Sequence, residues 1–301
     1  MKKILIAGAT GFVGTYLINY LLEKGYFINA LSRRSKQVSH HTNLAYFQWD
    51  IHQQYIDRNA FENVDTIINL TGANIGEKRW TKERKSEIIS SRIKSIDLLY
   101  QYVSENKFSI NTFISSSAVG YYGAVTTDEI FKETAENGTD FLATVCKEWE
   151  NTVMKFNDIG IRTVILRKGV IIGKDGGIVQ KLAPLAKLGI NVSLGSGKQF
   201  LPWIDIRDLV KLYEFILSNS KINGIYNTVS SENITMNEFS KTLLKSYKMR
   251  TILPNAPAFI IRLLFSEMSV MFLEGSKVSN EKLKKTGFSF EFDTIEKSLL
   301  L

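Results

Sequence analysis

Short apolar runs recur through the first half of the chain, separated by longer stretches whose apolar residues lie three and four positions apart. Apolar runs of this kind predict strands buried on both faces, as in a parallel sheet that helices cover on either side. The predicted strands are residues 3–6, 26–31, 44–49, 66–70, 112–115 and 163–166. The alternation therefore predicts an α/β fold.

The stretches between these runs predict amphipathic helices. The longest covers residues 81–103, with Thr81 as its N-cap and one continuous apolar face. Thr235 and Glu238 have the spacing of a capping box and predict the start of another helix. The remaining predicted helices are residues 13–22, 141–156 and 209–217.

Beyond Gly169 the alternation is less regular, which predicts a substrate-binding part interleaved with the sheet. We expect residues 1–250 to form a cofactor-binding domain, with substrate-binding segments at about 170–205 and 225–250, followed by a short helical extension over residues 251–301. Apolar residues of this extension recur at helical spacing and predict an element docked on the body. They are Ile260, Ile261, Leu264, Met268, Met271 and Phe272.

A glycine motif follows the first predicted strand and opens the first predicted helix. Gly8 permits a tight turn, Gly11 lets the backbone approach a pyrophosphate, and Gly14 lets helix and strand pack closely. The phosphates would meet free N–H groups at the positive end of the helix dipole. Strand, glycine turn and helix in this order predict a doubly wound parallel sheet of the Rossmann type that binds a dinucleotide.

The residues after the second predicted strand indicate which dinucleotide. An NAD site places Asp or Glu about 20 residues beyond the last glycine, to bind the ribose 2′-hydroxyl. This chain has Ser32, Arg33 and Arg34 there instead, and guanidinium groups suit a 2′-phosphate. Two solvated loop arginines are the alternative interpretation. Together with the glycine motif, the arginines predict NADP(H) rather than NAD.

Composition narrows the class of protein. The 301 residues are 44% hydrophobic and 23% charged, as in ordinary globular proteins. A single cysteine fits a reducing cytosol, and the first strand begins so close to the N-terminus that no cleavable signal is expected. The longest apolar stretch, residues 258–273, is interrupted by polar residues and is too short to span a bilayer. We therefore expect a cytoplasmic protein without a membrane partner. The net charge of +8 is spread along the chain without a nucleic-acid-binding motif, so no nucleic-acid partner is expected. His40, His41 and His52 lack metal-site spacing, and no metal is expected.

Several motifs together carry a family resemblance. The glycine motif, residues 115–123 (SSSAVGYYG) and Leu166-Arg167-x-Gly169 resemble the extended, epimerase/dehydratase form of the short-chain dehydrogenase/reductase superfamily. Residues 69–75 (NLTGANI), Gly195-Ser196-Gly197-Lys198-Gln199 and the extension that begins at Ala256-Pro257 are similar to an atypical branch, the epimerase family or sugar-nucleotide epimerase-like proteins. The resemblance covers nearly the whole chain.

The resemblance implies roles for further residues. Thr10, Gly11, Phe12 and Val13 would line the pyrophosphate, Ser32 and Arg33 the 2′-phosphate, Leu70 and Thr71 the adenosine side, and Ile171 the nicotinamide end. Glu87 and Arg92 resemble polar cofactor contacts of this branch, although a solvated helix face explains them equally well. The branch has Trp-Ile-His where this chain has Trp203-Ile204-Asp205, and an acidic or small residue at the position of Arg207.

The catalytic pair typical of these enzymes is absent. They use a tyrosine and, four residues later, a lysine that lowers the pKa of the tyrosine. With Glu150 as the reference point, those positions hold Leu142 and Cys146, while Lys147 is one residue out of place. The remaining hydroxyl groups follow the fifth predicted strand, at the edge where ligands of parallel sheets bind. They belong to Ser116, Ser117, Tyr121 and Tyr122.

The sequence is compatible with two functions. One is an NADP(H)-dependent oxidoreductase or epimerase-like enzyme with an unusual proton donor among these hydroxyl groups, acting on an unknown small carbonyl or sugar-derived substrate. The other is a protein that binds NADP(H) as a sensor or regulator without turnover, in which case the tyrosines only pack beneath the cofactor. One fold can carry both functions. We expect a monomer or homodimer.

Overall fold

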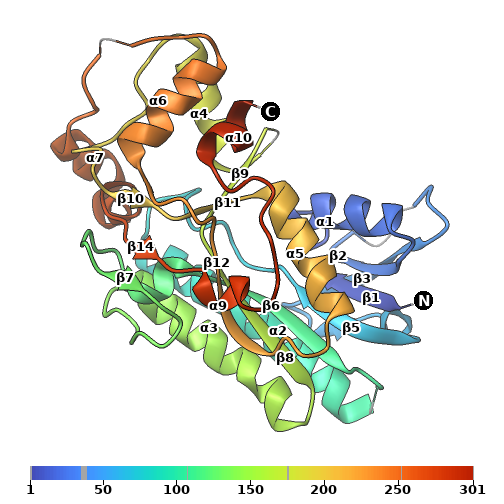
Figure 1. Cartoon of the computed structure of the whole chain (residues 1–301). Coiled ribbons are helices and arrows are strands. Elements are labelled where there is room, and N and C mark those ends of the chain that lie inside the picture. The colour runs from blue at the N-terminus through green and yellow to red at the C-terminus, as the bar shows by residue number, and fades with distance from the viewer. Residues whose placement is uncertain (1, 35–38, 107, 175, 252, 301) are drawn as a thin grey trace.

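The computed structural model describes residues 2–34, 39–106, 108–174, 176–251 and 253–300. Its main strands are β1 (Lys3–Ala7), β2 (Phe27–Ser32), β3 (Leu44–Asp50), β4 (Tyr55–Ile56), β5 (Val64–Asn69), β6 (Thr112–Ala118), β8 (Arg162–Lys168) and β12 (Gly224–Thr228). Within the described residues they form one sheet in the order β12-β8-β6-β5-β1-β2-β3-β4 (Figure 1). All neighbours are parallel except β3 and β4. The predicted doubly wound α/β fold is confirmed.

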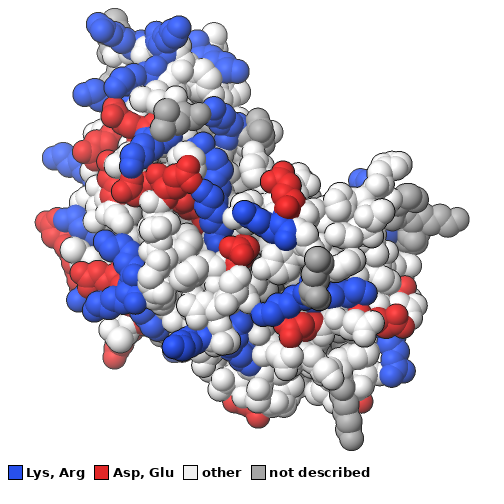
Figure 2. Space-filling view, turned by 45° about the vertical axis from the view of Figure 1, so that its right-hand side comes forward, with Lys and Arg blue, Asp and Glu red and all other residues white. Residues whose placement is uncertain are grey.

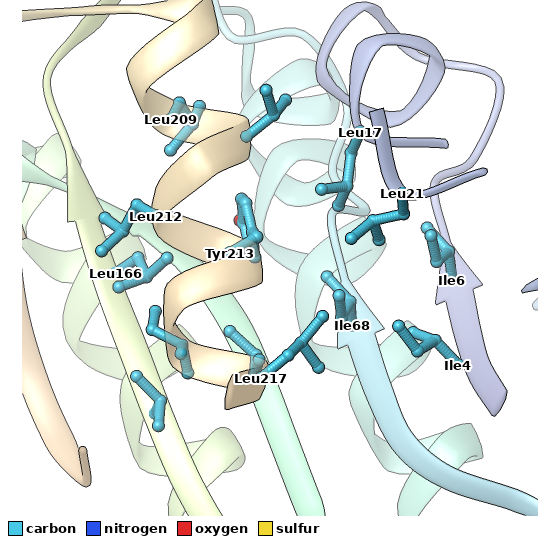
Figure 3. Packing of buried hydrophobic residues seen from close by; sticks show 14 of the residues in the cluster. Ile4, Ile6, Leu17, Leu21, Ile68, Leu166, Leu209, Leu212, Tyr213 and Leu217 are labelled. Carbon is cyan, nitrogen blue, oxygen red and sulfur yellow. The ribbon is translucent and has the colours of Figure 1, made fainter. Parts of the chain in front are cut away.

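Helices cover both faces of this sheet. On one face lie α1 (Phe12–Glu23) and α5 (Ile206–Ser218), and on the other α2 (Lys82–Asn106) and α3 (Phe141–Asp158) (Figure 1). Alternate residues of β1 serve the two layers: Ile4 and Ile6 pack with α1 and α5, and Leu5 packs with α2 and α3. Figure 3 shows the first layer, where Leu17 of α1 and Tyr213 of α5 lie over the strands. Burial on both faces explains why the strands are continuous apolar runs.

Capping residues fix the helix starts that the sequence predicts. Thr81 Oγ1 accepts a hydrogen bond from the backbone N–H of Arg84 at 3.2 Å. The capping box of Thr235 and Glu238 is formed at the start of α6 (Met236–Ser246). Each capping side chain satisfies a backbone N–H that the first helical turn leaves without a partner. These helix starts are confirmed.

A smaller unit follows β8 along the chain. It contains α4 (Gly177–Lys187) and four short strands. The strands are β9 (Val170–Gly173), β10 (Phe200–Leu201), β11 (Trp203–Asp205) and β13 (Ile234–Thr235). β9 pairs with β11, β10 pairs with β13, and α4 and α6 share a separate apolar cluster. Residues 224–228, which the sequence analysis did not assign to the sheet, form β12 beside β8. This short strand carries few apolar residues and so gave no strand signal.

The C-terminal extension is mostly helical and docks on the body. Its elements are α7 (Ala258–Phe265), the 3₁₀ helix η3 (Ser266–Ser269), α8 (Val270–Leu273), β14 (Lys277–Val278), α9 (Glu281–Lys284) and α10 (Ile295–Leu300). β14 pairs with β7 (Ile130–Phe131), a strand pair that the sequence did not predict. Ile261 and Met268 are buried as expected. The expectation is wrong for Ile260 and Leu264, which are 38% and 53% exposed, because the short α7 turns Ile261 and Phe265 inward.

Asp205 and Arg207, the positions where the chain departs from the branch that it resembles, compensate each other. Asp205 caps α5, accepts two hydrogen bonds from the Arg207 guanidinium at 2.9 and 2.8 Å, and accepts another from Ser298 of α10. The carboxylate is buried, and this pairing offsets part of its desolvation cost. The pair therefore links α5 to the C-terminal extension.

Charge is distributed unevenly over the surface. Figure 2 shows Lys and Arg gathered at the end of the molecule where α4 and α6 lie, with both signs interspersed over the rest of the visible face. The exposed lysines there include Lys181 and Lys187 of α4 and Lys241 and Lys245 of α6. The basic cluster is thus separate from the glycine turn between β1 and α1 (Figure 1). Of the helices in the described ranges, none has the length and apolar character needed to cross a membrane.

Two further 3₁₀ helices complete the chain. They are η1 (Arg58–Phe61), which precedes β5, and η2 (Val119–Tyr122), which directly follows β6. The second matters for the site, because it holds both tyrosines of the predicted catalytic group at the carboxyl edge of the sheet.

Candidate functional site

The turn between β1 and α1 is built for a close ligand. Gly8 has a φ of 82°, and a Cβ there would lie 2.8 Å from the carbonyl carbon of Leu70. A Cβ on Gly14 would lie 2.4 Å from the Gly8 oxygen, so only glycine allows α1 to approach β1 this closely. No side chain caps the start of α1 at Gly11, and its first turn holds no acid. Free N–H groups and the helix dipole therefore suit a pyrophosphate.

The end of β2 presents the two arginines to solvent. Ser32 is buried, and its Oγ accepts a hydrogen bond from the backbone N–H of Arg34 at 3.1 Å. Both guanidinium groups are exposed and, within the described ranges, neither forms an ion pair with a carboxylate. Cations that no acid neutralises are suited to an incoming phosphate. The geometry thus fits a 2′-phosphate at this position.

Leu70 and Thr71 follow β5, the strand beside β1 at the switch point of the sheet. The Leu70 backbone N–H donates to the Ala7 carbonyl oxygen at 2.8 Å, which sets the loop against the glycine turn. Thr71 is buried, and its Oγ1 donates to Asn69 Oδ1 at 2.6 Å and lies 2.7 Å from Ser95 Oγ. Its hydroxyl therefore holds the loop on α2, and any contact that Thr71 makes with a cofactor stays a prediction.

Glu87 and Arg92 lie in different environments on α2. Glu87 is exposed and pairs with Arg84 at 2.7 Å. Arg92 is buried, donates to the Ile88 carbonyl oxygen and lies over the Trp149 ring, while its Nε has no hydrogen-bond partner among the described residues. Burial lowers the pKa of Arg92 to about 10. The solvated-face alternative thus does not describe Arg92, whereas Glu87 fits it.

A cleft of about 1120 Å³ joins the glycine turn to the smaller unit. Thr10, Gly11 and Phe12 belong to its lining, as does Ile171 of β9. Phe12 packs against the start of α4, since a Cβ on Gly176 would lie 2.2 Å from its ring. The structure therefore brings the predicted pyrophosphate and nicotinamide contacts into one cleft.

Two of the four predicted hydroxyl groups belong to a buried polar network. Arg167 at the end of β8 makes a bidentate ion pair with Glu150 of α3, at 2.9 and 2.8 Å, with both side chains buried. Ser117 donates to Glu150 at 2.6 Å. Tyr122 accepts from Arg167 at 3.0 Å and donates to Asn227 of β12 at 2.6 Å. Burial is the main cause that raises the pKa of Tyr122, to about 12, so this hydroxyl is a poor base at neutral pH.

The other two hydroxyl groups are not tied into this network. Lys168 Nζ donates to Ser116 Oγ at 2.7 Å, across the carboxyl ends of β8 and β6. Tyr121 is half-buried with its ring 3.4 Å from the Arg167 guanidinium carbon, and its hydroxyl has no hydrogen-bond partner in the described part of the chain. The Tyr121 hydroxyl thus has capacity for a new partner, whereas the Ser116 hydroxyl is buried and already accepts from Lys168.

Lys168 is a residue that the sequence analysis missed. Its side chain is half-buried, and within the described ranges no carboxylate lies within 4.0 Å of its Nζ. Burial and, to a smaller extent, the positive charge of Arg92 lower the pKa of Lys168 to about 7. Gly169 and Val170, the next residues, line the cleft. A lysine that ends a predicted buried strand at the ligand-binding edge was the available signal.

Cys146 occupies the position where the resemblance places a catalytic lysine. The thiol is buried, and burial together with the negative charge of Glu150 raises its pKa to about 12. Such a thiol stays protonated and unreactive at neutral pH. In the described part of the chain, no group of three or more His, Cys, Asp or Glu side chains is arranged to hold a metal ion.

Comparison with known proteins places these features in a family. A model described as the NAD dependent epimerase/dehydratase family matches residues 4–228, and one described as a domain of unknown function (DUF1731) matches residues 256–300. An epimerase family protein of Staphylococcus aureus strain N315 is 31% identical over 305 residues, covering 99% of this chain and 98% of the relative.

Solved structures share the fold over the whole chain. The human epimerase family protein SDR39U1 (isoform 2), determined with NADPH, has a TM-score of 0.86 at 24% identity and covers 99% of this chain and 98% of its own. The UDP-glucose 4-epimerase of Thermus thermophilus, in complex with NAD, has a TM-score of 0.76 at 18% identity and covers 99% and 97%. At these identities the likeness shows the fold.

Proposed function

The chain belongs to the NAD-dependent epimerase/dehydratase family, and from this premise we propose that it is an NADP(H)-dependent oxidoreductase or epimerase-like enzyme that acts on a carbonyl or hydroxyl group. The observation that carries the proposal is the hydrogen bond of 2.7 Å between Lys168 Nζ and Ser116 Oγ at the carboxyl edge of the sheet. It supplies a group able to exchange protons near neutral pH where the tyrosine and lysine typical of the superfamily are missing.

The preference for NADP(H) over NAD(H) rests on this chain's own residues. Ser32, Arg33 and Arg34 stand at the end of β2 without an acidic residue, and the exposed guanidinium groups would bind a 2′-phosphate. Thr10 to Gly14 would hold the pyrophosphate, and Ile171 would contact the nicotinamide end. Of the solved structures that share the fold, the human protein was determined with NADPH and the Thermus thermophilus epimerase with NAD, so the fold can hold either cofactor.

Side chains of the protein would carry out the proton transfer in this reaction. A bound nicotinamide cofactor supplies the hydride chemistry. The Lys168 ammonium, with its pKa lowered to about 7, can give a proton to the oxygen of a reduced carbonyl, directly or through the Ser116 hydroxyl, and can take it back in the reverse direction. Arg167 and Glu150 hold β6, β8 and α3 together beneath this pair. Tyr121, whose hydroxyl has no partner in the described residues, is the second proton donor to test.

A non-catalytic NADP(H) sensor is the second candidate function. The observation that favours it is the burial of Ser117 and Tyr122 in the Arg167–Glu150 network, which leaves them no freedom to act on a substrate. A sensor would need only the glycine turn and the arginines. We place such a protein, like the enzyme, in the cytoplasm, with a single cysteine kept reduced.

Calorimetric titration of NADPH and NADH tests the cofactor assignment. In wild type we expect NADPH to bind more tightly, and Arg33→Ala should cost about 1.5–3 kcal/mol in NADPH binding, as for a hydrogen bond to a charged group, with NADH unaffected. Arg58→Ala removes another exposed arginine, which lies outside the predicted cofactor contacts, and should change neither affinity. Equal affinities of the wild type for the two cofactors would overturn the assignment.

Consumption of NADPH in the presence of a panel of carbonyl compounds tests the choice between enzyme and sensor. Substrate-dependent oxidation by the wild type supports the enzyme. Tight NADPH binding without turnover on any compound of the panel favours the sensor instead.

A further inference from the structure

The cleft extends well beyond the residues that would hold a cofactor, and that further part is apolar. α4 contributes Ile178 and Leu182, β10 contributes Leu201, and the C-terminal extension contributes Ile261, Phe265 and Phe272. All these residues are separate in sequence from the glycine turn, yet they line the same cavity as Gly169 to Ile171. Gly169, the residue after Lys168, thus belongs to this lining, although Lys168 and Ser116 themselves do not.

Charged groups are scarce along this lining. Among its described residues, Lys181 and Glu274 are the charged side chains, and their formal charges cancel. Glu274 also accepts a hydrogen bond from Thr126 at 2.5 Å. A nucleoside diphosphate sugar brings two phosphate charges, which protein sites usually meet with several Arg or Lys side chains or with a helix N-terminus. Beyond the cofactor contacts, the described lining offers one exposed lysine and the start of α4 at Gly176 and Gly177 for this purpose, and no cluster of cations.

The C-terminal extension is held firmly enough to act as one side of the cleft. Arg79 donates from Nε and Nη2 to the carbonyl oxygens of Leu264 and Leu263, at 2.5 and 2.7 Å. Gln199, itself buried, donates to the Phe272 carbonyl oxygen at 2.7 Å. These bonds attach α7 and α8 to the body, so the apolar residues that they contribute to the lining are held in place by the fold.

We infer that this cleft takes a largely apolar molecule, and not a nucleotide sugar, with its single carbonyl or hydroxyl group at the part of the lining formed by Gly169 and Val170, the residues after Lys168. The inference rests on the proposed function for the chemistry at that group. Binding of the apolar part follows from the lining alone, because the free energy of burial grows with the apolar area removed from water.

Binding of N-phenyl-1-naphthylamine, an apolar fluorescent probe, tests the site without turnover. We expect saturable binding to the NADPH-loaded wild type. Leu182→Asp places a carboxylate in the lining and should weaken probe binding by at least about tenfold, because an unpaired charge there is costly to desolvate. Leu185→Asp, one turn along the same helix at a position 42% exposed, is the matched control and should leave probe binding unchanged. Equal probe binding by both variants overturns the proposal.

NADPH affinity and the melting temperature of each variant show whether the body is intact. If Leu182→Asp does not fold, the test uses the wild type alone, with butanal, octanal, dodecanal and UDP-glucose as competitors of the probe. We expect displacement to strengthen with chain length, by about two- to fourfold for each added methylene until the cleft is filled. We expect none from UDP-glucose. Displacement by UDP-glucose and not by dodecanal overturns the proposal.

Turnover separates this proposal from the proposed function. Oxidation of NADPH with dodecanal faster than with butanal supports both. Displacement of the probe by dodecanal with no oxidation of NADPH by any carbonyl keeps the apolar site and overturns the enzymatic function. Reduction of polar carbonyls alone, without displacement of the probe by dodecanal, keeps the enzyme and overturns the apolar site.

Discussion

Arg167 and Lys168 are consecutive cations at the end of β8, and they have opposite surroundings. Arg167 is 1% exposed, makes a bidentate ion pair with Glu150 and has further contacts with Tyr121 and Tyr122. Lys168 is half-buried and donates to the neutral hydroxyl of Ser116, with no carboxylate within ion-pair distance in the described ranges. Successive side chains of a strand point to opposite faces of the sheet, so these two neighbouring residues lie in different environments.

The difference explains why Arg167 has a structural role whereas Lys168 is suited to proton transfer. Burial alone would lower the pKa of the Arg167 guanidinium, but hydrogen bonds and Coulomb attraction to Glu150 and Tyr122 together outweigh it and hold that pKa above the ordinary value. Lys168 lacks such compensation, so burial brings its pKa down to about 7. A group that gains and loses a proton near neutral pH suits general acid–base chemistry, whereas a fixed ion pair suits structure.

Removal of the Lys168 amine should have the largest effect on the reaction. Lys168→Met keeps the length of the side chain but removes the proton, and we expect the rate of carbonyl reduction to fall by about 10²–10⁴-fold, the usual share of general acid catalysis. NADPH affinity should barely change, since the amine acts on the substrate oxygen. Steady-state oxidation of NADPH and calorimetry of cofactor binding measure the two quantities.

Lys147→Met is the matched control for this variant. Lys147 is exposed on α3, one residue from the position of the catalytic lysine in the superfamily, and its loss should not change the rate. Ser116→Ala should show part of the Lys168→Met defect if the proton passes through the hydroxyl. Full activity of Lys168→Met would assign the proton elsewhere, with Tyr121→Phe as the next variant to measure.

Disruption of the Arg167–Glu150 ion pair should mainly lower the stability of the fold. Glu150→Ala leaves the Arg167 guanidinium buried without its carboxylate, and we expect a loss of about 3–5 kcal/mol in the free energy of unfolding. Denaturant unfolding measures it. Asp97→Ala breaks the Lys155–Asp97 pair, which is just as short at 2.7 Å but about half exposed, and should cost about 0.2–1 kcal/mol. Similar losses in the two variants would contradict the structural role of the buried pair.

The sequence predicted most strands of the sheet but not the different surroundings of Arg167 and Lys168. The buried strands are continuous apolar runs and the glycine turn has a fixed spacing, so the sequence pattern alone predicts both. β12 carries few apolar residues and β14 has only two residues, so neither gives a strand pattern. Leu264 faces solvent because the short α7 presents only one face to the body. Nothing local distinguishes Arg167 from Lys168: Glu150 and Ser116, which decide their roles, come from α3 and β6 and meet β8 only in the fold.

The pH dependence of the reaction should follow Lys168. Reduction needs the protonated amine, so kcat/KM should fall above pH about 7, by up to about tenfold for each pH unit, and this inflection should be absent in Lys168→Met. Stability should change in the opposite direction. Because the folded pKa of about 7 lies below the ordinary value of 10.5, the unfolded chain binds more protons between these values. The contribution of Lys168 to stability therefore rises with pH over this range. A flat pH–rate profile from pH 6 to 9 would remove Lys168 from the proton path.

Replacement of Cys146 should have the smallest effect, and it shows which element carries the proton. The thiol lies where the superfamily has its lysine, close enough to Glu150, Arg92 and Arg167 for their charges to act on its pKa. Burial keeps it protonated, so Cys146→Ala should cost about 1 kcal/mol of stability from lost packing and leave the rate of NADPH oxidation nearly intact. Thermal unfolding and initial rates measure the two effects side by side. A large loss of rate with stability retained would mean that the proton still travels along α3, as in the rest of the superfamily. An intact rate in Cys146→Ala, alongside a defect in Lys168→Met, would mean that the proton-transfer role has moved from α3 to the end of β8.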